Sequence, residues 1–133
     1  MVPEQALELL GDVELFDRFE PDDQHRLANA AELVQLVRND VVFVEGEEAD
    51  ACFVMVSGRV AISNKSVDGR ESMVAIMQRG DLFGEMGLFD ELGRSAEARA
   101  LEDSELMRVS YEVLRNIWED HPEQLWSVVR LLS

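Results

Sequence analysis

Hydrophobic and polar positions follow a helical spacing at the start of the chain. Apolar residues within the segment 4–10 recur three and four positions apart, which predicts an amphipathic helix. A second helix is predicted from Pro21, because Asp22 and Asp23 would lie in its first turn, where the helix dipole favours negative charge. Helices are therefore expected over about residues 3–30.

The middle of the chain, about residues 31–110, has a different pattern. Short runs rich in Val, Ile, Phe and Met alternate with turn signals such as Ser57-Gly58 and Asp68-Gly69, and the latter is typical of a tight hairpin. This pattern predicts an all-β sandwich or barrel. The runs expected to form strands are 33–37, 41–44, 52–56, 59–63, 72–78, 96–101 and 105–110.

Helical spacing returns after Ser110. A helix is predicted over 111–119, His121-Pro122 breaks it, and Pro122 suits the first turn of a further helix. That last helix is apolar nearly all round, so it is expected to pack against another part of this domain or against another subunit, and we predict that the chain forms a homodimer through it.

Length and composition predict one domain, residues 1–133, with no DNA-binding domain. The chain has 133 residues, of which 47% are hydrophobic, and it shows no membrane-spanning run and no signal peptide. Its single cysteine, Cys52, lies in an apolar run and is expected to be a buried thiol in a reducing cytoplasm. The net charge of −16 argues against direct binding of nucleic acid or of an anionic membrane.

The segment 82–100, LFGEMGLFDELGRSAEARA, carries the most specific chemistry. Residues 84–88 could form one helical turn whose free N–H groups attract an anion, and Arg94 offers a planar fork that matches two phosphate oxygens. Ser95 adds a hydroxyl donor, and an ionised Glu85 accepts hydrogen bonds as a ribose hydroxyl requires. Together these residues predict a site for one small phosphorylated ligand.

Each of these residues also has a simpler interpretation. Arg94 taken alone would be a surface arginine paired with Asp90 or Glu91, and Glu85 would be a solvated carboxylate or a helix cap. Catalysis is not predicted: His25 and His121 lie outside the strand region, so no histidine cluster is expected to bind a metal. No Ser-His-Asp arrangement is indicated either, so no catalytic residues and no cofactor are expected.

The string FGEMGLF-x4-RSA resembles the phosphate-binding cassette of cyclic nucleotide-binding domains, especially those of the Crp/Fnr superfamily of bacterial transcription regulators. The upstream segments EGEEADACFVMVSGRVAI and DGRESMVAIMQRGDLFGE resemble the strands that lead into that cassette, so the resemblance covers nearly the whole chain. It implies a mainly β fold with flanking helices, an eight-stranded jelly-roll barrel that holds cAMP or cGMP.

The resemblance also implies a role for each matching residue. Gly84 and the amides that follow it, including that of Met86, would contact the cyclic phosphate, and Glu85 would accept from the ribose 2′-OH. Arg94 would pair with the phosphate oxygens. The phosphate cup would be completed by Ser95 and Ala96, and the pocket lining by Phe83 and Val74. In this family a Thr after the Arg tends to accompany cGMP, so Ser95 favours cAMP.

Two departures from the family pattern leave a second hypothesis open. Ala98 is smaller than the usual Val, and Glu97 adds negative charge beside the anion site unless strand alternation turns it away. The helix residues that reach the adenine in this family would fall beyond Ser133. The first hypothesis is a cyclic nucleotide sensor, the effector domain of a transcription regulator. The second is an interaction or dimerisation module of the same fold that binds no nucleotide or another effector.

Overall fold

The computed structural model describes residues 3–65, 68–126 and 129 of the chain. The elements in chain order are α1 (Pro3–Gly11), α2 (Pro21–Ala30), β1 (Glu32–Leu36), β2 (Val41–Phe43), β3 (Ala51–Ser57), β4 (Val60–Lys65), β5 (Glu71–Met77), β6 (Leu82–Phe83), α3 (Met86–Asp90), β7 (Glu97–Ala100), β8 (Ser104–Ser110), α4 (Tyr111–Asp120) and the 3-10 helix η1 (Pro122–Leu125).

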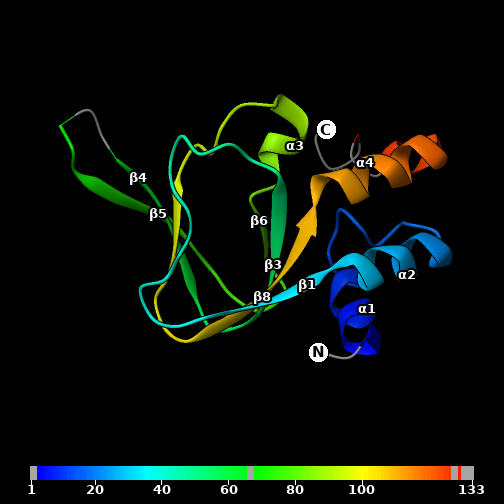
Figure 1. Cartoon of the computed structure of the whole chain (residues 1–133), viewed down its shortest axis with the longest axis horizontal. Coiled ribbons are helices and arrows are strands. Elements are labelled where there is room, and N and C mark those ends of the chain that lie inside the picture. The colour runs from blue at the N-terminus through cyan, green and yellow to red at the C-terminus, as the bar shows by residue number, and fades with distance from the viewer. Residues whose placement is uncertain (1–2, 66–67, 127–128, 130–133) are drawn as a thin grey trace.

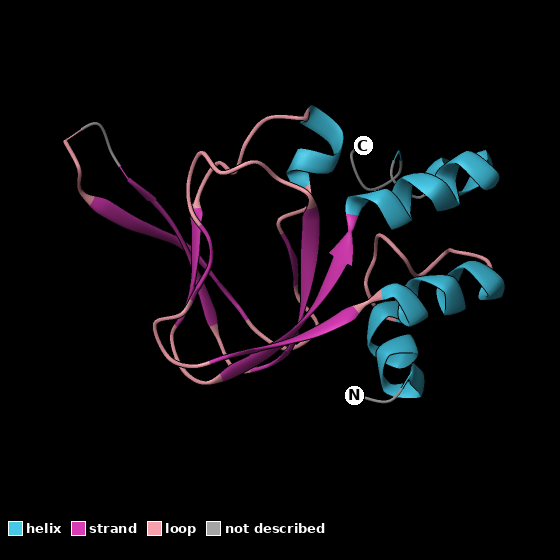
Figure 2. Cartoon of the chain, in the orientation of Figure 1, coloured by secondary structure: helices cyan, strands magenta, loops and turns pink. Residues whose placement is uncertain are grey.

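The strands form two four-stranded antiparallel sheets, in the orders β1-β8-β3-β6 and β2-β7-β4-β5. The helices α1, α2 and α4 gather on one side of the strands, and α3 lies at the end of the barrel near the start of α4 (Figures 1 and 2). The expected mainly β fold with flanking helices is confirmed.

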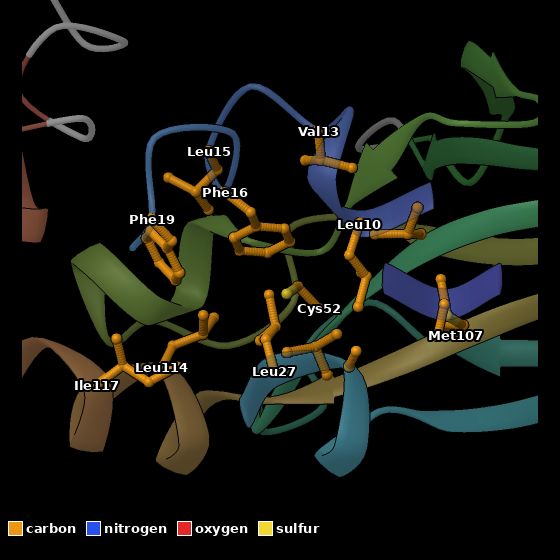
Figure 3. Close-up of a cluster of buried hydrophobic side chains, with 14 of the residues drawn as sticks. Leu10, Val13, Leu15, Phe16, Phe19, Leu27, Cys52, Met107, Leu114 and Ile117 are labelled. Atoms are coloured by element: carbon orange, nitrogen blue, oxygen red, sulfur yellow. The ribbon is translucent and has the colours of Figure 1, made fainter. Parts of the chain in front are cut away.

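Strand β3 is buried along both of its faces, because it lies between two hydrophobic clusters. Side chains alternate along a strand, so Cys52 and Val54 face the helices while Phe53 and Met55 face the interior of the barrel. Figure 3 shows the helix-side cluster, in which side chains from α1, α2 and α4 surround Cys52. The barrel interior is the smaller cluster, and its three phenylalanine rings lie within 6.2 Å of one another.

Helix α4 continues directly from the end of β8. The Ser110 hydroxyl caps it by accepting a hydrogen bond from the Glu112 N–H at 3.1 Å. Tyr111, Leu114 and Ile117 are buried at helical spacing, and this apolar face packs against α2 and β8. The local sequence therefore sets both where the helix begins and which face it buries.

Three expectations about elements differ from the structure. Strand β6 has two residues, too few to give a hydrophobic pattern, and no strand was predicted there. The helical turn expected over 84–88 lies at Met86–Asp90, because Gly84 has a positive φ of 78° and ends the preceding strand instead. After Pro122 the chain forms 3-10 helix rather than α-helix over Pro122–Leu125, and most of the expected last helix lies outside the described residues.

Candidate functional site

A cavity of about 240 Å³ opens beside β6 and α3. Its walls are residues 82–87 and 92–96 together with Phe43, Ala49, Ile62, Met77 and Asp90. The residues expected to bind the ligand and found in this lining are Phe83, Gly84, Glu85, Met86, Arg94, Ser95 and Ala96. The structure therefore brings around one cavity two segments, 82–87 and 92–96, that the end of α3 separates in sequence.

Val74 is not among the cavity residues, in contrast to the expectation. The pairing of β4 with β5 shifts between Ile62 and Ser63, whose partners are Ala75 and Met73, so Val74 is the extra residue of a β-bulge. Its side chain is 59% exposed. Sequence alternation could not reveal this shift, and Met77 from the same strand lines the cavity instead.

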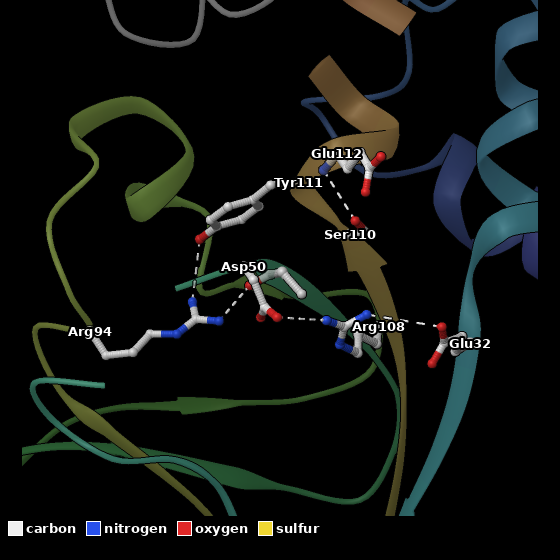
Figure 4. Close-up of polar contacts among 8 residues, drawn as sticks. Glu32, Asp50, Arg94, Arg108, Ser110, Tyr111 and Glu112 are labelled. Carbon is white, nitrogen blue, oxygen red and sulfur yellow. Dashed lines mark hydrogen bonds and ion pairs between the residues drawn. The ribbon is translucent and has the colours of Figure 1, made fainter. Parts of the chain in front are cut away.

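The Arg94 side chain is only 7% exposed, although arginine is rarely buried. Its Nη1 donates to the Gly84 carbonyl at 2.8 Å and to the Tyr111 hydroxyl at 3.3 Å, and its Nη2 donates to the Ala51 carbonyl at 2.6 Å. Figure 4 shows the guanidinium and the Tyr111 hydroxyl pointing toward each other. The surface pairing with Asp90 or Glu91 that Arg94 would make as an isolated residue does not occur.

Arg94 also lacks an anionic partner in the described part of the chain. All three of its acceptors are neutral oxygens, and it takes part in none of the ion pairs among the described residues. Its Nε is buried and has no hydrogen-bond partner there. The ring of Phe43 lies 4.2 Å from the guanidinium carbon, a cation–π contact worth about 0.5–2 kcal/mol.

The main chain holds the Arg94 loop in place. The Arg94 N–H donates to the Glu47 carbonyl at 2.7 Å, and the Gly46 N–H donates to the Arg94 carbonyl at 2.8 Å. Gly93 lies close to the same segment, since an added Cβ there would be 3.1 Å from the Gly46 carbonyl oxygen. These backbone contacts fix the loop after α3 against residues 46–47.

Tyr111 completes the polar contacts around the Arg94 guanidinium. Its hydroxyl donates to the Gly84 carbonyl and accepts from Arg94. Burial raises the pKa of the Tyr111 phenol above its ordinary value of 10, although the Arg94 charge acts in the opposite direction. The hydroxyl therefore stays protonated at neutral pH and remains a hydrogen-bond donor.

The acidic residues near the cavity face different ways. Glu85 lines the cavity, is partly exposed, and its side chain makes no capping bond to α3. Glu97 is turned away from the cavity, because its carboxylate pairs with Arg99 at 2.8 Å while Ala98 points into the barrel. Among the described residues that line the cavity, Arg94 is the only cation.

No group of three or more His, Cys, Asp or Glu side chains suited to a metal occurs within the described residues. None of the described helices combines the length and apolar character that crossing a membrane requires. Burial raises the pKa of the Cys52 thiol to about 12, so this cysteine is an unreactive member of the core.

Three contacts of Arg94 were not expected from the sequence. Tyr111 is predicted only as part of the helix 111–119, and Phe43 only as part of the strand 41–44. Tyr111 is the single tyrosine of the chain and lies at the junction of a strand and a helix, and these two facts could have marked it as a candidate site residue. The Ala51 carbonyl offered none, because every residue carries one.

Comparison with known proteins places this geometry in a family. The family model described as cyclic nucleotide-binding domain matches residues 33–121. The chain is 31% identical over 126 residues to the CRP-like cAMP-activated global transcriptional regulator of Mycobacterium tuberculosis, an overlap of 95% of this chain and 56% of that protein. The chain thus spans about half the length of the curated relatives it matches.

Solved structures agree in fold. The N-terminal domain of a transcriptional regulator from Streptomyces coelicolor A3(2) has a TM-score of 0.81 and 30% identity, over 93% of this chain and 87% of that one. The sensor domain of the transcriptional regulator DNR from Pseudomonas aeruginosa has a TM-score of 0.89 and 26% identity, over 98% and 87%. The proteins compared here are named as regulators and not as enzymes.

Proposed function

The chain belongs to the cyclic nucleotide-binding domain family, among regulators of the Crp/Fnr type, and from this premise we propose that its cavity binds cAMP in preference to cGMP. Ser95 after the arginine supports this preference, as does the relative named as cAMP-activated. In this proposal the ligand is bound by the predicted residues that line the cavity, namely Phe83, Gly84, Glu85, Met86, Arg94, Ser95 and Ala96.

The observation that carries the proposal is the buried charge of Arg94 with no acidic partner among the described residues. A buried guanidinium is costly unless an anion accompanies it, and an unpaired buried N–H costs about 1–3 kcal/mol more. A cyclic phosphate carries one negative charge, opposite in sign to that of Arg94, the only cation among the described lining residues. It would supply both the missing counter-charge and an acceptor for the remaining N–H groups.

The rest of the cavity supports a nucleotide as a whole. Glu85 offers acceptors for a ribose hydroxyl, and Ser95 adds a hydroxyl donor at the phosphate. The apolar lining, including Ile62, Met77 and Leu92, offers a surface for the base. Polar and apolar lining residues would thus match the two ends of one ligand.

The proposed role is that of a sensor, the effector domain of a cytoplasmic bacterial transcription regulator. Ligand binding would act through differential affinity for two arrangements of the cassette and of α4. Direct contact with nucleic acid is not proposed for this chain, given its charge of −16. Leu125, Trp126 and Val129 are exposed, which supports a homodimer formed through the C-terminal segment; light scattering that finds only monomer at high concentration would contradict it.

One observation favours the second hypothesis, an interaction module without a nucleotide. Three of the five N–H groups of Arg94 already bind protein oxygens, as in a purely structural arginine. In that case Arg94 would stabilise the loop after α3 and the cavity would not bind a cyclic nucleotide. The two hypotheses differ in whether removing Arg94 changes ligand affinity or only stability.

Calorimetric titration with cAMP and cGMP tests the proposal on wild type, Arg94→Ala and a control, Arg99→Ala. The control removes an equal charge on β7, outside the cavity. We expect saturable binding of cAMP, weakened in Arg94→Ala by about 2–4 kcal/mol, or roughly 30- to 700-fold, and unchanged in Arg99→Ala. Absence of binding to either nucleotide, or equal affinity in Arg94→Ala, would overturn the proposed function.

A further inference from the structure

The Tyr111 hydroxyl joins three parts of the molecule that are far apart in sequence. It accepts from Arg94 of the loop after α3 and donates to Gly84 at the end of β6, and it belongs to the first residue of α4. The side chain is 1% exposed, so bulk water does not compete for these bonds. The ring is also held from its backbone, since the Tyr111 N–H donates to the Asp50 carbonyl at 2.9 Å.

The first consequence concerns Arg94. Its contacts with Gly84, Tyr111 and Ala51 occupy three N–H groups, which leaves Nε–H and one N–H of Nη2. These contacts restrict the guanidinium to one orientation before a ligand arrives. A side chain with many rotamers loses less freedom on binding when it is already held in this way.

The second consequence concerns the peptide that joins Gly84 and Glu85, two residues of the cavity wall. A trans peptide is planar, with its C=O and N–H on opposite sides. By fixing the Gly84 carbonyl, Tyr111 therefore also fixes the direction of the Glu85 N–H. Gly84 itself has a φ of 78°, a backbone conformation that residues other than glycine rarely adopt. Glycine therefore allows the orientation that this peptide has.

We propose that Tyr111 is a positioning residue for the ligand: its hydroxyl sets the orientation of Arg94 and of the Gly84–Glu85 peptide, and so joins the cavity to α4. The inference rests on the proposed function and adds to it the group that makes the connection. Tyr111 does not touch the ligand in this proposal; it acts through Arg94 and Gly84.

The neighbourhood of Tyr111 explains how α4 would respond. A Cβ added at Gly87 in α3 would lie 3.0 Å from the Tyr111 hydroxyl oxygen, so α3 and the tyrosine ring are packed closely. One turn along α4, the Arg115 guanidinium carbon lies 5.7 Å from the ring centre. A change in Arg94 or in the 84–85 peptide on binding therefore reaches the first turn of α4 through a single side chain.

The test compares Tyr111→Phe with Ser110→Ala. Tyr111→Phe removes only the hydroxyl, whereas Ser110→Ala removes the cap of the same helix without touching Arg94 or Gly84. Calorimetry with cAMP and thermal unfolding are measured on both. We expect Tyr111→Phe to bind at least about tenfold more weakly than wild type. We expect Ser110→Ala to bind like wild type even though its helix is less stable.

The outcomes separate this inference from the proposed function. If wild type binds neither cAMP nor cGMP, the proposed function fails and the inference fails with it. If wild type binds and Tyr111→Phe binds equally well, only the inference is overturned. The same holds if Ser110→Ala loses as much affinity as Tyr111→Phe, because Tyr111 would then act merely through the stability of α4.

A second measurement uses the fact that Tyr111 is the only tyrosine of the chain. Tyrosine labelled with ¹³C at Cζ gives one NMR signal that needs no assignment, and it serves even if Tyr111→Phe fails to fold. Saturating cAMP is expected to shift this signal in wild type and to leave it unmoved in Arg94→Ala. An unmoved signal in wild type that binds cAMP by calorimetry would overturn the inference.

Discussion

Two charged residues are buried in the described part of the chain, and their surroundings differ. Asp23, 1% exposed in α2 on the helix side, has cationic or protonatable partners: His121 at 2.7 Å and Arg26 at 3.7 Å. Arg94, 7% exposed beside the cavity, has only neutral acceptors in the described chain. Oppositely charged or protonatable side chains offset the cost of burying Asp23. For Arg94, neutral acceptors in the described chain offset that cost only partly.

This difference indicates that the buried charge of Asp23 serves stability, whereas that of Arg94 serves the proposed ligand binding. The helix-side charge ties α2 to the end of α4, because His121 follows that helix directly. The helix-side cluster does leave the Trp118 Nε1 unpaired, but that donor is neutral and lies away from the cavity lining. Among the described residues, only at Arg94 does an unpaired donor coincide with a buried charge and a cavity, which is the combination that an anionic ligand would complete.

The largest change in stability is expected when the helix-side charge is removed. We expect Asp23→Ala to lower the free energy of unfolding by about 1.5–3 kcal/mol, because hydrogen bonds to a buried charged group are lost. Its exposed neighbour Asp22 is the control, and Asp22→Ala should change stability little. Urea unfolding measures both variants, and a loss of cAMP affinity in folded Asp23→Ala would contradict the proposed separation of roles.

The second prediction uses two glycines with positive φ, Gly58 in the turn between β3 and β4 and Gly84 in the cavity wall. Gly58 has a φ of 84°, and a Cβ there would lie 2.1 Å from the Ser104 Oγ and 2.7 Å from the Asp103 carbonyl oxygen. Gly84 has a φ of 78°, and its Cβ would meet the Arg94 Nη1 at 3.0 Å. Substitution by alanine strains the backbone at both positions by about 1–3 kcal/mol.

We expect Gly58→Ala to lose stability alone, and Gly84→Ala to lose both stability and ligand affinity. Gly58→Ala should lose the more stability, because a backbone oxygen and a buried serine cannot move aside easily, and it should keep its ligand affinity. Gly84→Ala should lose affinity as well, because the added methyl displaces the guanidinium. Thermal unfolding and titration with cAMP measure the pair, and a Gly84→Ala variant that binds like wild type would contradict the assignment of Arg94.

The smallest effect is expected at the solvent-accessible ion pair of Glu97 and Arg99. The hydrogen bond from Arg99 lowers the pKa of Glu97, so this pair stabilises the fold above the ordinary carboxyl pKa and the contribution is lost as the pH falls through the acidic range. Because the pair is solvent-accessible, Glu97→Gln should flatten the acid limb of the stability curve only slightly. Denaturant midpoints from neutral pH to pH 3 measure this change in stability. A stability curve that falls more steeply at acidic pH in Glu97→Gln than in wild type would contradict the prediction.

The sequence predicted the elements that have a strong local signal. Helices α1, α2 and α4 and the longer strands follow from apolar periodicity, capping residues and turn signals, and their observed bounds lie close to the predicted ones. Strand β6 and the bulge at Val74 escaped prediction, because a two-residue strand has no period and a bulge is set by the partner strand. The two sheet orders likewise depend on which distant strands pair.

The amino-acid sequence alone indicates the family and seven of the residues that line the cavity, because the cassette from Phe83 to Ala96 keeps its chemistry within one continuous stretch. Only the tertiary structure decided how Arg94 is held. Its partners are the Ala51 carbonyl, 43 positions away, the Phe43 ring, and the Tyr111 hydroxyl, 17 positions along the chain. Contacts of this kind form when strands and helices pack together, and burial then gives a single unpaired charge an importance that its place in the sequence does not reveal.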